Sequence, residues 1–247
     1  MRLSETAGAE PGADVAQHAA GTGTAQRVAL AGAGTAQRVA ASLRDRIAEG
    51  GLKPGEQLPE AALAEAYGVS RNTVREAFRL LVHERLVVHE FNRGVFVRVP
   101  GPDDIVDIYA VRCALETAGV RAAGQASPQL LAGVTRAVEE GEEAAARDDW
   151  PHVADAGIRF HRALAALAGS PRTDSYMSAI LAELRLVFQA MPSPAHLHKP
   201  FVGRNRAIAE RVARAELDLA ETELRSYLSD SRQLILDTLD AQAEARP

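Results

Sequence analysis

Apolar positions recur at helical spacing along most of this chain. In residues 68–81 they fall at i, i+3, i+4 and i+7, which places them on one face of a helix. These positions are Val74, Ala77, Phe78 and Leu81. Ser70 precedes them, and its hydroxyl can accept a backbone N–H of the first helical turn. The pattern therefore predicts a capped amphipathic helix that begins just after Ser70.

Two more helices are predicted on the N-terminal side of this one. The first covers residues 35–49, with Thr35 as its cap and a Gly-Gly pair after it. The second is short, begins at Pro59 and ends at Gly68, just before Ser70. A short helix, a tight turn and a capped second helix make a helix-turn-helix.

A β-hairpin is predicted on the C-terminal side. Residues 87–88 and 95–97 are β-branched or aromatic, and an Asn-Arg-Gly turn at 92–94 joins them. A helix, a helix-turn-helix and a hairpin together form a winged helix-turn-helix, which we assign to residues 34–99.

Polar residues off the apolar stripe suggest a ligand for this domain. Arg71 and Arg75 lie one turn apart near the helix start, beside Asn72. Guanidinium forks suit guanine edges and phosphates, and an amide can pair with adenine, so this face suits the DNA major groove. Arg93 could enter the adjacent minor groove, where Gly94 permits close approach. The predicted DNA contacts are Ser70, Arg71, Asn72, Thr73, Arg75, Arg93 and Gly94. The alternative is an ordinary surface helix with solvated arginines.

The chain changes character after a Pro-Gly-Pro linker at 100–102, because only helical signals follow. Helix starts are predicted near Asp103, Pro128, Pro151 and Ser170, with later helices over about 202–214 and 217–240. Residues 191–201 contain three prolines and are predicted to form a loop. The fold class is therefore mainly α, with residues 103–245 forming a bundle of six or seven helices.

Charge and composition limit the function classes. The net charge of −5 hides an asymmetry, since residues 35–100 carry ten Lys/Arg and eight Asp/Glu, while residues 101–247 carry sixteen and twenty-two. The more basic part is the winged helix, as phosphate binding requires. A single cysteine, Cys113, excludes an intrachain disulfide. No apolar run reaches the length of a membrane span, so we expect a cytoplasmic protein without a membrane partner. Residues 1–33 lack helical periodicity and are expected to be a disordered tail.

Residues 36–99 resemble the DNA-binding domain of GntR-type bacterial transcription regulators. The motifs that carry the resemblance are Leu43-Arg44-x-x-Ile47, Leu52-x-Pro54-Gly55-x-x-Leu58, Leu63-Ala64, Gly68-Val69-Ser70-Arg71, Val74-Arg75-Glu76-Ala77 and Arg93-Gly94. The family often has Thr-Pro where this chain has Asn72-Thr73, a change that bears on which operator is read.

Residues 103 to about 235 resemble the FCD effector domain of the FadR branch of this family. The matching residues are Arg112-x-x-Leu115-Glu116, Phe160-His161-x-x-Leu164, Ala168-Gly169-Ser170, Arg206-Ala207-Ile208 and Asp218-x-x-x-Glu221. The resemblance implies a homodimer in which a small-molecule effector, for example a carboxylate metabolite, changes affinity for double-stranded operator DNA.

Many relatives of this branch hold a divalent metal through one Asp and three His. At those positions this chain has Gly157, His161, Asn205 and Tyr227, and Asp155 lies on a different helical face. An imidazole with an amide and a phenol is a poor zinc or nickel set, so we expect no metal and no other cofactor. We expect His196 and His198 to be solvated loop residues rather than replacement ligands.

The same positions can still form a polar effector pocket. Arg112 is the best candidate for binding a carboxylate, although pairing with Glu116 at i+4 is an equal alternative. His161 is either an effector contact or a satisfied core histidine. The predicted effector contacts are Arg112, His161, Asn205, Tyr227 and, more weakly, Arg185.

The sequence thus predicts a DNA-binding transcriptional regulator, more specifically a repressor. An enzyme is the rival from another class, but nothing supplies a nucleophile or a second acid at useful spacing. The other rival is a DNA-binding protein whose effector site has decayed.

Overall fold

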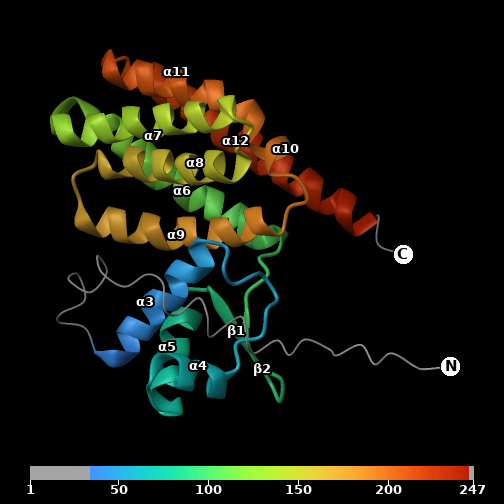
Figure 1. The fold of residues 1–247 in the computed structure, drawn as a ribbon. Helices are drawn as coiled ribbons and strands as arrows, with labels where there is room; N and C mark the ends of the chain where they lie inside the picture. The colour runs from blue at the N-terminus through green and yellow to red at the C-terminus, as the bar shows by residue number, and fades with distance from the viewer. Residues whose placement is uncertain (1–33, 245–247) are drawn as a thin grey trace. The chain divides into compact units, whose positions relative to one another are not determined.

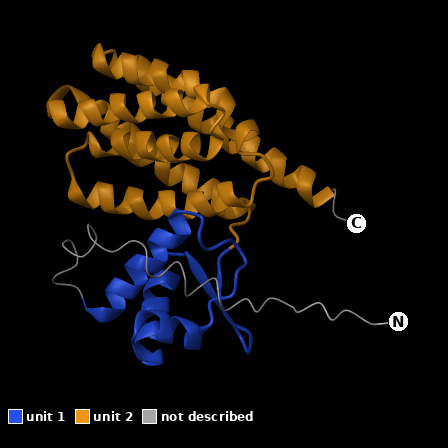
Figure 2. Ribbon diagram, viewed as in Figure 1, with its two compact units in different colours: residues 1–98 blue, residues 99–247 orange. Residues whose placement is uncertain are grey.

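The computed structural model describes residues 34–244, which form two compact units divided after Arg98 (Figure 2). The tail expected at residues 1–33 lies outside the described residues. None of the described helices is both long and apolar enough to span a bilayer.

Three helices build most of unit 1: α3 (Thr35–Ala48), α4 (Glu60–Tyr67) and α5 (Arg71–His83) (Figure 1). The prediction of Thr35 as the first cap is wrong. Gly34 is the N-cap, and Thr35 is the first helical residue. The other signals are confirmed, since Gly68 ends α4 in the left-handed region at φ +63° and Ser70 caps α5.

Strands β1 (Val87–Glu90) and β2 (Gly94–Val97) pair in an antiparallel hairpin, with Val87 opposite Val97 and Glu90 opposite Gly94. Val95 and Val97 point into the core of unit 1, where Leu43, Leu63, Phe78 and Leu81 are also buried. Together with the helices, this hairpin confirms the predicted winged helix-turn-helix.

Unit 2 consists of helices only. Its elements are α6 (Pro102–Ala122), η2 (Ala123–Gln125), α7 (Pro128–Ala146), α8 (Trp150–Ala166), α9 (Pro171–Gln189), α10 (Pro194–His198), η3 (Lys199–Phe201), α11 (Val202–Ala213) and α12 (Leu217–Glu244). Pro102 is the first residue of α6 rather than the last of the linker. The segment predicted as a loop contains α10 and η3, because Ser193 caps a turn whose first residue is a proline.

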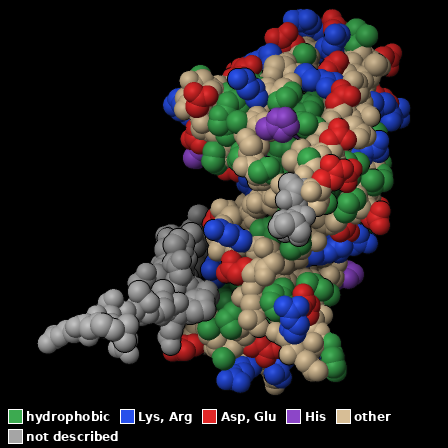
Figure 3. All heavy atoms as spheres, turned by 90° about the vertical axis from the view of Figure 1, so that its right-hand side faces the viewer, with side chains coloured by type: hydrophobic (Ala, Val, Ile, Leu, Met, Phe, Trp, Pro, Cys, Tyr) green, Lys and Arg blue, Asp and Glu red, His purple; other side chains and the backbone are tan. Residues whose placement is uncertain are grey.

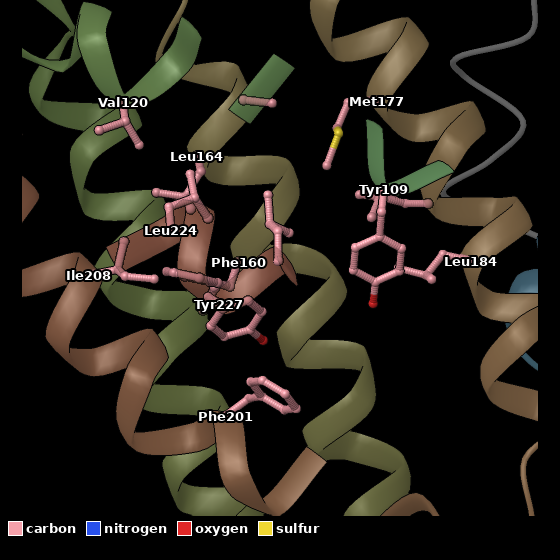
Figure 4. Close-up of a cluster of buried hydrophobic side chains, with 14 of the residues drawn as sticks. Tyr109, Val120, Phe160, Leu164, Met177, Leu184, Phe201, Ile208, Leu224 and Tyr227 are labelled. Atoms are coloured by element: carbon pink, nitrogen blue, oxygen red, sulfur yellow. The ribbon is translucent and has the colours of Figure 1, made fainter. Parts of the chain in front are cut away.

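The core of unit 2 lies where α8 packs against α6, α7 and α9. Figure 4 shows its aromatic part, in which Phe160, Tyr227 and Phe201 lie close together. Helices α6 and α8 approach very closely at Gly119. A Cβ atom at this position would lie only 2.0 Å from the backbone oxygen of Leu164, which leaves no room for a side chain. This contact fixes the positions of the two helices that carry Arg112 and His161.

Candidate functional site

The start of α5 is held by local hydrogen bonds. The Ser70 Oγ accepts the backbone N–H of Thr73 at 3.1 Å, and the two hydroxyl oxygens lie 2.9 Å apart. Val74, Ala77 and Phe78 anchor the opposite face in the core. Capping and burial thus fix the helix and leave Arg71 and Asn72 exposed on its outer side.

The arginines of α5 differ in their partners. Arg71 makes no ion pair with another described residue, whereas the Nε of Arg75 lies 2.8 Å from Glu60 on α4. Arg79 pairs with Glu76 within the same helix. These are exposed pairs of the kind that contribute little to stability, so phosphate oxygens can replace the carboxylates. On the face drawn in Figure 3, basic and acidic side chains are intermixed, so individual arginines matter more there than a broad basic patch.

The hairpin turn is braced from within unit 1. The Gln57 Nε2 donates to the backbone oxygen of Arg93 at 2.8 Å. The Arg93 guanidinium pairs with Glu90 and lies 5.3 Å from the centre of the Phe96 ring. Gly94 has φ +107°, a conformation that a residue with a side chain rarely adopts. Arg93 is exposed as predicted, but a neighbouring carboxylate partly neutralises it.

A small cavity lies among α6, α8, α9, α10, η3 and α12 in unit 2. Its polar lining residues are Arg112, His161, His198, Tyr227 and Ser231, and the remainder is apolar. The space that admits the centre of a water molecule is about 20 Å³, which is room for about one water. A larger ligand must therefore displace part of the wall.

Arg112 is 1% exposed, and its Nε donates to Glu116 Oε1 at 3.0 Å. The other carboxylate oxygen, Oε2, lies 2.6 Å from Nδ1 of His161. Of the two open readings, the Arg112–Glu116 pair is therefore present, and Arg112 lines the cavity as well. The Nη2 atom of Arg112 is buried and has no hydrogen-bond partner in residues 34–244. A buried charged donor with no acceptor is unfavourable, so this atom is available to bind an anion.

Burial sets the protonation states around this cavity. Burial lowers the pKa of His161, while the nearby His161 ring and the Arg112 guanidinium keep the pKa of Glu116 low despite its own burial. The carboxylate is therefore ionised and accepts a hydrogen bond from the Nδ1–H of a neutral imidazole. Nε2 of His161 then carries a lone pair, and it has no partner among the described residues.

Tyr227 stands beside His161, with the ring centres 5.0 Å apart. Its hydroxyl makes no hydrogen bond with another described residue, and burial raises its pKa, so the phenol is neutral. The cavity thus combines a cationic donor, an imidazole acceptor and a phenol, a set suited to a small polar molecule.

The prediction that His198 is a solvated loop residue is wrong. It lies at the end of α10, lines the cavity, and packs edge-on against Phe188 at 4.8 Å between ring centres. Its Nε2 is buried without a partner, and burial lowers its pKa to about 4. Three nearby prolines favoured a loop in the sequence, and only the Ser193-Pro194 cap signal could have predicted this helix. His196 is exposed as expected, but it lies in α10 rather than in a loop.

Two predicted effector contacts are not cavity residues in this structure. Arg185 pairs with Asp155 through Nη2, and it does not line the cavity. Asn205 lies on α11, where its Oδ1 is buried without a partner, but its side chain does not line the cavity. The positions inferred from the resemblance therefore converge only in part.

The residues present do not fit the metal that the resemblance implies. Gly157 supplies no donor, Nδ1 of His161 is engaged by Glu116, and Asn205 is outside the cavity. In the described ranges, no group of three or more His, Cys, Asp and Glu side chains could hold a metal ion. No step in the function of this site is therefore derived through a metal.

Comparison with known proteins finds a match to a known domain in each of the two units. The profile of bacterial regulatory proteins of the gntR family matches residues 35–97, and the FCD domain profile matches residues 107–230. A crystal structure of a GntR transcriptional regulator from Rhodococcus sp. RHA1 is 43% identical in sequence. Its TM-score is 0.75, and the match covers 82% of this chain and 97% of that one.

Two curated relatives are similar over different lengths. The galactonate operon transcriptional repressor of Escherichia coli (strain K12) is 27% identical over 213 residues, 77% of this chain and 92% of that protein. The HTH-type transcriptional regulator YdhC of Bacillus subtilis (strain 168) is 34% identical over 103 residues, 41% of this chain and 46% of that protein. With a winged helix in unit 1 and an FCD domain in unit 2, this chain belongs to the GntR family of DNA-binding transcriptional regulators.

Proposed function

We propose that this protein is a homodimeric repressor whose α5 helices read an operator and whose unit 2 cavity binds a small anionic effector. The DNA contacts are Arg71, Asn72 and Arg75 in the major groove. Ser70 and Thr73 lie at the helix start, and Arg93 and Gly94 lie in the hairpin turn. The exposed, unpaired guanidinium of Arg71 at the capped end of α5 supports this assignment.

The observation that carries the effector assignment is the unpartnered Nη2 of Arg112 at a cavity wall. Because Glu116 neutralises the arginine through Nε only, the outer nitrogen can still donate to a carboxylate oxygen. The Tyr227 hydroxyl and Nε2 of His161 can then bind further oxygens or hydroxyls. Galactonate, named in one relative, is a carboxylate with several hydroxyls and is therefore a suitable first probe.

A thermal-shift series tests the effector assignment. D-galactonate, L-lactate and acetate are compared with neutral D-galactose, and a selective carboxylate should raise the melting temperature of the full chain. Tyr227→Phe should keep the stability of the parent, because the hydroxyl has no described partner, but it should weaken binding several-fold. Prior treatment with a chelator should leave binding unchanged. If no carboxylate stabilises the parent, the cavity is not a carboxylate site and the decayed-domain alternative is preferred.

Operator control requires that the effector distinguish two states of the protein, since a ligand shifts an equilibrium only by its differential affinity. We expect the effector to change operator affinity by about 1–3 kcal/mol. A Gly-Ser insertion after Gly101 should preserve effector binding and diminish this change, as measured by operator titrations with and without effector. An equal response in both proteins would contradict coupling through the junction at residues 99–101.

A further inference from the structure

Phe91, at the hairpin turn of unit 1, is 86% exposed, more than any other large hydrophobic side chain in the described part of the chain. The apolar residues that follow it in the hairpin, Val95 and Val97, are buried. Single exposed apolar residues are common on proteins, so exposure alone assigns no role. The support beneath this residue and the surface beside it are more informative.

The turn that carries Phe91 is held in one shape. Asn92 has φ +58°, and the backbone N–H of Arg93 donates to the oxygen of Glu90 at 3.1 Å. The side chain of Gln57 also donates a hydrogen bond to the backbone oxygen of Arg93, and the backbone of Gln57 forms a β-bridge with Phe96. The phenyl ring is therefore presented on a braced turn, so little conformational freedom remains to be lost on binding.

The hairpin and the recognition helix share one surface. A groove between them is lined by Arg75 and Arg79 of α5, by His89 and Val95 of the hairpin, and by Glu60, Phe78 and Val82. Two guanidinium groups beside this groove suit one sugar-phosphate strand of a duplex. When α5 occupies the major groove and one strand lies in this groove, the hairpin turn reaches the adjacent minor groove.

We propose that Phe91 inserts its ring into this minor groove and partly unstacks a base step, which bends the operator. Apolar side chains act as wedges of this kind in other minor-groove proteins, which also use arginine and lysine to read the groove. Arg93, two residues on, supplies the cation here, and its pairing with Glu90 is exposed and exchangeable. This inference rests on the proposed DNA binding. Arg75, Arg79 and Arg93 pair with carboxylates that phosphates can replace, and this favours DNA over a protein partner.

The test uses full-length protein and a duplex that the parent selects from a random-sequence pool. Phe91→Ala should weaken binding about tenfold, a loss typical of one aromatic–base stacking contact. It should also reduce the DNA bend measured by end-to-end energy transfer. Phe91→Leu should retain part of both. Tyr176→Ala, which removes a 66% exposed aromatic from α9, is the matched control and should bind and bend DNA like the parent.

Each outcome has a defined meaning. A parent that selects no duplex overturns the proposed function, and the wedge with it. A parent that binds while Phe91→Ala binds and bends equally overturns the wedge alone. If Phe91→Ala loses affinity but leaves the bend and competition by the minor-groove ligand netropsin unchanged, Phe91 contacts a protein surface instead, and the proposal is wrong. Equal melting temperatures of the variants and the parent exclude a folding defect.

Discussion

The two units use arginine in opposite ways. In unit 1, Arg71, Arg75 and Arg93 are exposed, and among the described residues they have either no partner or a weak, exchangeable one. In unit 2, Arg112 is buried, is paired with a buried carboxylate, and has an Nη2 atom without a hydrogen-bond partner among the described residues. A polyanion that brings many phosphates suits the first arrangement, whereas one small anion suits the second. Replacing an arginine should therefore affect DNA binding alone at these positions of unit 1, whereas replacing Arg112 in unit 2 should also lower stability.

The largest effect is expected from Arg112→Met. Removing one partner of a buried pair leaves Glu116 as an uncompensated charge, and we expect a loss of about 3–5 kcal/mol in the free energy of unfolding. Chemical denaturation measures this loss. The double variant Arg112→Met with Glu116→Gln should recover at least half of it, because no buried charge remains. If the single variant is as stable as the parent, the pair is not buried in solution.

Arg71→Ala and Arg75→Ala should each lower operator affinity by about 1–3 kcal/mol, because each removes a base or phosphate contact. Their melting temperatures should match that of the parent, in contrast to Arg112→Met. Operator titrations and thermal unfolding separate the two effects. Two variants that bind DNA like the parent would contradict the assignment of α5 as the recognition helix.

Acid should destabilise unit 2 through His198. Its folded pKa of about 4 lies below the ordinary 6.5, so the unfolded state binds more protons between these values. The stabilising contribution is complete above pH 6.5 and is lost as the pH falls toward 4, which gives about 2 kcal/mol between pH 7 and pH 5. Arg185, Asp155 and His161 face this imidazole.

His198→Leu isolates this contribution, since the other titrating groups remain. Unfolding free energies of parent and variant measured at pH 7 and pH 5 should differ in slope, with the smaller decrease in the variant. Identical slopes would show that His198 is already solvated in the folded protein.

The smallest effect is expected from Glu60→Gln. The Glu60–Arg75 pair is exposed, so its loss should change stability by less than about 1 kcal/mol. Operator affinity should rise two- to threefold, because a carboxylate beside the phosphates is gone and Arg75 is released. Affinity that falls instead would show that Glu60 positions Arg75 for DNA.

Local signals predicted most of the fold. The Ser70 cap, the Gly68 break and the proline-started helices of unit 2 depend on interactions between near neighbours, and the structure confirms them. The same is true of Arg112 and Glu116, whose i+4 spacing puts them in contact on one helix. Contacts between residues of one helix depend on their spacing along the chain, so they can be predicted from the sequence.

The cavity was harder to predict because its walls come from distant segments. His198 reaches it from α10, and no spacing in the sequence relates that residue to Arg112. Asn205 was predicted as an effector contact from the family resemblance, yet its side chain is outside the cavity. A change of residue type at one position can alter which side chains meet in a pocket. Arg185 was predicted as a weaker effector contact, but it pairs with Asp155, thirty residues earlier in the chain.

The close contact at Gly119 distinguishes two sides of the cavity. One side is formed by α6 and α8, and the other is formed by α10. Arg112 and His161 belong to α6 and α8, whose backbones are in contact at Gly119, so this contact sets the distance between the two helices. His198 reaches the cavity from the short α10, which does not take part in that contact. Any side chain at position 119 would push α6 and α8 apart and would move Arg112 and His161 away from each other. Substitution of this one glycine would therefore change effector selectivity without altering any residue that touches the effector.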